Sequence, residues 1–233
     1  MKSYRYFQSI ATSIEPRLSS KWLARMTLVQ KVIRFPVPSL YYGDSDVYPA
    51  TPPSVNTILD NILPNTFGRV VSTRGLKNAS PLVSYATILL LTASFLKYDD
   101  VARAIEKVIS TSKVEGISKW HECLSQLRDG FRKRLPDVLT VVSVYQSTHT
   151  RTEIGSDEAE VTAQQEMMQD STLRLLRFYQ QYLPEAMMEA MVDPASFIPT
   201  DILTMRPESL VNLLDMLSNV PDLRWTNKAG TLK

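Results

Sequence analysis

The sequence contains few of the residues on which common catalytic and metal sites depend. A single cysteine, Cys123, excludes an internal disulfide and a thiolate cluster for structural zinc, and it is typical of a reducing compartment such as the cytosol or nucleus. The two histidines, His121 and His149, lack the spacing of a zinc-protease helix. Close positions along a helix diverge, so a partly buried thiol at Cys123 and a surface histidine at His121 explain these residues better than a nucleophile pair.

Glycine is also scarce, with seven residues against fourteen prolines. No two glycines are two or five positions apart, which excludes both a dinucleotide-binding loop and a phosphate-binding P-loop. The balance is typical of a helical chain with proline-bearing connections and not of a barrel rich in tight turns.

An excess of charge of either sign is lacking as well. Lys and Arg number 26 and Asp and Glu number 24, so the net charge of +2 demands neither nucleic acid nor a membrane as partner, and any basic function must be local. The six acids between 152 and 170, without a basic residue among them, lack the alternating ligands and central glycine of a calcium loop. They predict an exposed linker followed by the solvated start of a helix.

The rest of the chain is expected to be organised around one apolar stretch, residues 78 to 97. Ser80 and Pro81 predict the start of a helix, with the Ser80 side chain accepting a backbone hydrogen bond. Its uncharged part, Pro81 to Leu96, has sixteen residues, or roughly 24 Å, against about 30 Å for the core of a bilayer. We therefore expect a buried helix ending at the break Tyr98-Asp99-Asp100. Its expected apolar positions include Leu82, Ala86, Leu89, Leu90, Ala93 and Leu96.

Apolar residues at helical spacing predict further helices along the chain. One begins at a Ser20 cap with Trp22 facing inward, and another carries a stripe that includes Trp120 and Phe131. Residues 138 to 144 are rich in β-branched side chains, so a buried strand is an alternative to the favoured helix there. The other expected helices cover residues 6–14, 55–62, 67–76, 101–112, 171–183 and 207–217.

This pattern predicts an all-α protein, an irregular helical-repeat segment of the HEAT or armadillo type. No fixed repeat period is visible, so an irregular bundle remains an alternative. We expect a helical-repeat segment at 1–148, an acidic linker and solvated helix start at 149–170, a continuing helical segment at 171–219 and a frayed tail at 220–233. No residue pattern indicates an enzyme, a cofactor or a metal.

The segment from Arg128 to Arg134 is the one local concentration of positive charge, with net +3 in seven residues. Arg128 and Arg132 are one helical turn apart on the face away from Phe131, as phosphate-contacting side chains would be. The alternative is a solvated helix end whose cations offset the carbonyl pole of the helix. The candidate RNA contacts are Arg128, Arg132, Lys133 and Arg134.

Several stretches in order resemble one family. They are KWLA at 21–24, IRFPVPS at 33–39, RGLK at 74–77 with SPLV at 80–83, and RDGFRKRLPD at 128–137. Together they resemble the N-terminal region of the nucleolar pre-ribosomal-associated scaffolds of the Urb or Npa type, which act in early 60S subunit assembly. Ser84 and Tyr85 stand where that family's repeat has arginine and histidine, which puts an RNA contact at that point in doubt.

The resemblance implies a non-catalytic α-solenoid in the nucleus and nucleolus, and a chain that is a piece of a longer scaffold. It implies as partners pre-rRNA of the large subunit, other 60S assembly factors including a DEAD-box RNA helicase and a second large Urb-type scaffold, and small nucleolar RNPs. No membrane and no small-molecule substrate is implied. The alternative is a nuclear or cytosolic protein-interaction module without RNA contact, which docks a partner on the acidic linker and on a ridge of Met187, Met188 and Met191.

Overall fold

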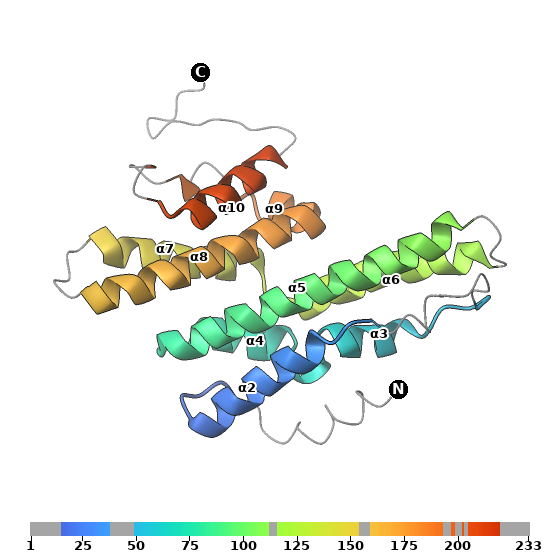
Figure 1. The fold of residues 1–233 in the computed structure, drawn as a ribbon, viewed down its shortest axis with the longest axis horizontal. Coiled ribbons are helices and arrows are strands. Elements are labelled where there is room, and N and C mark those ends of the chain that lie inside the picture. Colours follow the sequence, from blue (N-terminus) through green and yellow to red (C-terminus); the bar gives the residue numbers. More distant parts are fainter. Residues whose placement is uncertain are drawn as a thin grey trace. The chain divides into compact units, whose positions relative to one another are not determined.

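The part of the chain that the structure describes is helical, without a strand, as the sequence predicts. This computed structural model describes residues 15–37, 49–111, 116–153, 159–192, 197–198, 202 and 205–219. The helix expected at 6–14, most of the loop from 35 to 53 and the tail at 220–233 lie outside these ranges. The elements are α2 (Ser20–Ile33), α3 (Val55–Ile62), the 3-10 helix η2 (Asn65–Phe67), α4 (Arg69–Leu76), α5 (Pro81–Ser110), α6 (Ile117–Arg134), α7 (Val138–Glu153), α8 (Ala159–Tyr182), α9 (Pro184–Glu189) and α10 (Pro207–Ser218), as labelled in Figure 1.

The chain divides into two compact units, unit 1 (Met1–Pro136) and unit 2 (Asp137–Lys233). The division falls between α6 and α7, and not in the acidic stretch expected as a linker at 149–170. Helix α7 continues to Glu153 and α8 begins at Ala159, so helix occupies most of that stretch. Residues 138 to 144 belong to α7, which confirms the helix and excludes the strand.

Helix α5 is the centre of unit 1, because α2, α3, α4 and α6 all pack against it. The ring of Phe131 from α6 stacks on Tyr98 with centroids 4.7 Å apart and meets Phe95 edge-on at 5.1 Å. Pairs in these geometries contribute about 0.5–1.5 kcal/mol each beyond the burial of their area. Trp22, Trp120 and Phe131 are buried, as expected from the sequence.

The start signals of the helices follow the sequence closely, with two corrections. Ser19, not Ser20, caps α2, and its Oγ accepts a hydrogen bond from Trp22 N at 3.2 Å. At α5, Ser80 does occupy the capping position before Pro81, but its side chain makes no capping bond. Asn78 Oδ1 instead accepts a hydrogen bond from Ser80 N at 3.0 Å, which fixes the turn from α4 into α5.

The break expected at Tyr98-Asp99-Asp100 does not exist, because α5 runs without interruption to Ser110. Neither proline nor glycine occurs at this point to stop the helix. Arg103 lies four and three residues on, and it pairs with Asp99 at 2.5 Å and with Asp100 at 3.1 Å. Such pairs support a helix, so two aspartates that look like a turn signal are accommodated inside it.

The buried side of α5 differs in part from the expected stripe. Leu90 is buried and Leu89 is half-buried, but Leu82 is 44% exposed. Leu82 lies in the first turn, where Val83 and not Leu82 faces the core. By length and composition α5 would be long and apolar enough to cross a membrane, yet 67% of its most apolar window is buried inside the structure. This burial is typical of a core helix, which is what the sequence predicts for this stretch in preference to a membrane span.

Unit 2 is built on α8, against which α7, α9 and α10 pack (Figure 1). Tyr145 of α7 meets Phe197 edge-on at 5.2 Å and its hydroxyl donates to the Phe197 carbonyl oxygen at 3.2 Å. Arg177 of α8 binds α10 twice, through Asn212 Oδ1 at 3.0 Å and Asp215 at 2.8 Å. The buried positions of α10 are Ser209, Asn212, Leu213 and Met216. Leu213 is therefore the one leucine of this helix that is fully buried, whereas Leu214 is exposed.

Candidate nucleic-acid interface

Helix α6 carries the four candidate RNA contacts, and its orientation is fixed at its first turn. Gly116 precedes the helix with φ +84°, a conformation that favours glycine, and a side chain there would clash with the Ala50 carbonyl oxygen. Trp120 Nε1 donates to the Pro49 carbonyl oxygen at 3.2 Å. The buried stripe of Trp120, Cys123, Leu127 and Phe131 then directs the remaining side chains outward.

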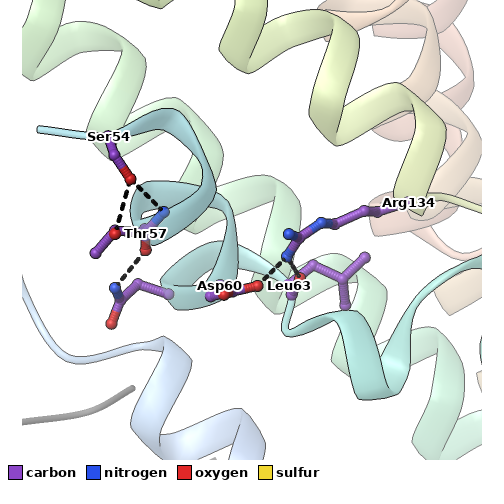
Figure 2. Close-up of polar contacts among 6 residues, drawn as sticks. Ser54, Thr57, Asp60, Leu63 and Arg134 are labelled. Atoms are coloured by element: carbon purple, nitrogen blue, oxygen red, sulfur yellow. Dashed lines mark hydrogen bonds and ion pairs between the residues drawn. The ribbon is translucent and has the colours of Figure 1, made fainter. Parts of the chain in front are cut away.

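Arg134 is the exception, because its side chain is paired inside the fold. Its side chain is 14% exposed, and Nη1 lies 2.6 Å from Asp60 Oδ1 and 2.7 Å from the Leu63 carbonyl oxygen (Figure 2). The Arg134 charge is therefore used inside unit 1, where it joins the end of α6 to α3. Helix α3 reaches this position because α6 has Gly130 at the contact, where a Cβ atom would lie 2.5 Å from Leu59 Cδ1.

The other three candidate RNA contacts, Arg128, Arg132 and Lys133, differ in their exposure to solvent. Arg132 and Lys133 are exposed in the last turn of α6, whereas Arg128 is half-buried. Arg128 and Arg132 each already take part in an intramolecular interaction. Their position also fits the alternative of a solvated helix end, because cations in the last turn offset the carbonyl pole. The structure thus leaves Arg132 and Lys133 as the exposed pair of the segment.

Cys123 and His121, the residues considered above as a nucleophile pair, lie in the environments that the sequence suggests. Cys123 is buried and free, and burial raises the pKa of its thiol, while His121 is exposed. The described residues contain no group of three or more His, Cys, Asp or Glu side chains able to hold a metal ion. The buried thiol of Cys123 and the exposed side chain of His121 thus lie in different environments on α6.

The methionine ridge expected in unit 2 is not a single face. Met187 is buried, whereas Met188 is 66% and Met191 is 91% exposed. Helix α9 ends at Glu189. Met191 has φ +50°, which is not a helical conformation, so its side chain does not continue the face of the helix. Exposed apolar side chains also occur on α10, at Val211 and Leu214. Unit 2 therefore has apolar side chains on its surface, but not in the arrangement that the sequence suggested.

The tertiary structure brings together a second group of cations, at the start of α2 and the end of α4, that was not expected from the sequence. Arg74 lies 2.7 Å from Glu15, and Asn78 Nδ2 donates to the Pro16 carbonyl oxygen at 3.1 Å. These contacts bring Arg17 and Lys77, the neighbours of Pro16 and Asn78 in the chain, to the same region. We call Arg17, Lys21, Arg74 and Lys77, all exposed, the basic corner.

A signal for the basic corner was present in the sequence, but it is a shortage of acids and not a run of bases. Residues 61 to 98 include four basic and no acidic residues, and residues 15 to 37 include five basic residues and one acid. Unlike the dense charge at 128–134, the cations of these stretches are spread along the chain.

No protein-family model, curated protein or solved structure matches the chain.

Proposed function

We propose that this chain is a non-catalytic scaffold segment of a nucleolar ribosome-assembly factor that acts in early 60S pre-ribosome maturation. It binds pre-rRNA of the large subunit and other assembly factors, including a DEAD-box helicase, a second large Urb-type scaffold and small nucleolar RNPs. The observation that carries the RNA-binding part is the exposed pair Arg132 and Lys133 at the end of α6, within the segment 128–137 on which the family resemblance depends.

The architecture proposed for this scaffold is an irregular α-solenoid of the HEAT or armadillo type. Consecutive helices pack against each other in both units, α4 on α5 and α5 on α6 in unit 1, and α7 on α8 in unit 2. Stacked helix pairs of a solenoid make such contacts between neighbours. The long helical surfaces of such a solenoid present side chains to several partners.

The experiment that tests the proposal is UV crosslinking of the tagged full-length protein in cells, followed by sequencing of the bound RNA. We expect a discrete peak on pre-rRNA of the large subunit, and a weaker peak for Arg132→Ala/Lys133→Ala. Arg134 is left unchanged, because its removal would act on stability. The matched control is Lys107→Ala/Lys119→Ala, which removes the same charge from exposed positions at the other end of the α5–α6 pair. A peak as strong in the first variant as in the control would move the RNA contact away from α6.

The second candidate function is a protein-interaction module without direct RNA contact, in a nuclear or cytosolic complex. The exposed Met188 and Met191, with Val211 and Leu214 on α10, favour it, because methionine-rich and aliphatic surfaces adapt to protein partners. Affinity purification at low and high salt separates the two candidates. Apolar docking persists at high salt, whereas phosphate contacts weaken steeply.

A further inference from the structure

Helices α2 and α5 run parallel, so that both begin at the basic corner. Three contacts pair them in order along the chain. Before the two helices, Asn78 Nδ2 donates to the Pro16 carbonyl oxygen at 3.1 Å. Further along, Gln30 Nε2 donates to the Ala86 carbonyl oxygen at 3.0 Å. At the end of α2, Lys97 Nζ donates to the Phe35 carbonyl oxygen at 2.5 Å. The corner is therefore formed by the start of two parallel helices and the end of α4, which leads into α5.

Among the described residues, four of the five charged side chains named at this corner are positive. Arg17, Lys21, Arg74 and Lys77 are exposed, and Glu15 is the acid beside them. The Glu15–Arg74 pair is itself exposed, with side chains 73% and 61% accessible, and such pairs contribute little to stability. A phosphate can therefore replace Glu15 at low cost. The contacts of Glu15 with Arg74 and of Pro16 with Asn78 bring the neighbouring cations into one region, where their charges act together on a ligand.

The backbone also adds positive potential at this corner. Each helix has the positive end of its dipole at its first residue, and both α2 and α5 begin here. At α5 the cap side chain makes no hydrogen bond to the first turn, and every ionisable residue within α2 is basic. Side chains and backbone thus favour an anion at the same place.

We propose that the basic corner binds the phosphodiester backbone of RNA, as a surface separate from the end of α6. The inference rests on the proposed RNA-binding function and gives that function its main contact in unit 1. RNA is favoured over an acidic peptide because further basic residues follow on more than one side of α2, the half-buried Arg25 and the exposed Lys31, with Arg34 directly after the helix. A polymer of regularly repeated phosphates can use such a distributed charge, since phosphate contacts need no apolar anchor.

The test is RNA binding by the purified full-length chain, measured by fluorescence anisotropy with labelled single-stranded RNA between about 50 and 200 mM salt. We compare the wild type with Lys21→Ala/Lys77→Ala, with Arg132→Ala/Lys133→Ala and with the matched control Lys107→Ala/Lys119→Ala. Circular dichroism verifies that each variant keeps the helical content of the wild type. Loss of two phosphate contacts should weaken binding by the corner variant roughly tenfold and lower its salt slope by about 1.5, with no change in the control.

The outcomes separate this inference from the proposed function. If the corner variant binds as the wild type does while the α6 variant loses affinity, the inference is overturned and the proposed function stands. If the wild type does not bind RNA at physiological salt, both are overturned. Labelled polyglutamate of equal length is the competing probe, and tighter binding of polyglutamate than of RNA would overturn the assignment of RNA to this surface.

Discussion

Arg134 and Asp60 form an ion pair with 2.6 Å between Nη1 and Oδ1, although they are 74 residues apart in the sequence. Both side chains are largely buried, with 14% and 20% of their surfaces exposed. The same Nη1 also donates to the carbonyl oxygen of Leu63, which follows the last residue of α3. A basic residue that the sequence assigns to a partner is thus a structural link between two helices.

Replacement of Arg134 by alanine should destabilise unit 1 by about 2–3 kcal/mol, because Asp60 and the Leu63 carbonyl group would keep their burial and lose their donor. Urea denaturation followed by circular dichroism measures the change. In a double-mutant cycle, Asp60→Asn should cost less once Arg134 has been removed. Unchanged stability together with weaker RNA binding would return Arg134 to the set of phosphate contacts.

Gly75 in α4 should not tolerate alanine, although alanine favours helices. A Cβ atom there would lie 3.0 Å from Thr87 Cγ2 and closer still to its hydroxyl, and Thr87 is a buried, β-branched residue of α5. We expect Gly75→Ala to lower the free energy of unfolding by about 1–2 kcal/mol.

Two further variants test this explanation for Gly75. Adding Thr87→Ala to Gly75→Ala should recover much of the lost stability, because it removes the Thr87 hydroxyl and methyl groups that the new Cβ atom would meet. Gly130→Ala should cost less than Gly75→Ala, since its Cβ would meet only the flexible end of Leu59. Equal losses for the two glycine variants in the same denaturation experiment would contradict the packing argument.

Leu82 and Val83 are neighbours in the chain whose truncation should affect stability to very different extents. Val83 is fully buried and Leu82 is 44% exposed. Val83→Ala should cost about 2 kcal/mol through lost burial and a cavity, whereas Leu82→Ala should change stability by no more than about 0.5 kcal/mol. Thermal denaturation of the pair measures both. A larger loss at Leu82 would show that the first turn of α5 is covered in the intact protein.

Cys123 should react with a thiol reagent only when unit 1 opens. The residue is buried, and burial raises the pKa of its thiol, so the reactive thiolate is scarce in the folded state. A thiol whose pKa is higher in the folded state contributes stability that is present below its unfolded pKa and is lost as the pH rises through the folded pKa. Labelling with a disulfide reagent at mildly alkaline pH should therefore be slow in buffer and fast in urea. Rapid labelling in buffer would show that α6 is loosely packed.

The amino-acid sequence by itself determined the helical class and many helix boundaries. Proline at the first position of α5 and α10 and serine before α3 act within one turn of the chain, so their effect can be read without knowledge of the fold. The stripe of α6 that contains Trp120 and Phe131 is likewise a matter of spacing along one helix.

The tertiary structure decided which side chains remain available and which are used inside the fold. Arg134 looks like its basic neighbours in sequence, and only the packing of α3 against α6 brings Asp60 to it. Arg103 keeps α5 helical through two aspartates, and Glu15 and Pro16 bring the start of α2 to the end of α4. Helix formation depends on residues one turn apart, whereas burial and ion pairing depend on residues far apart in the chain, and a single sequence does not show which of those will meet.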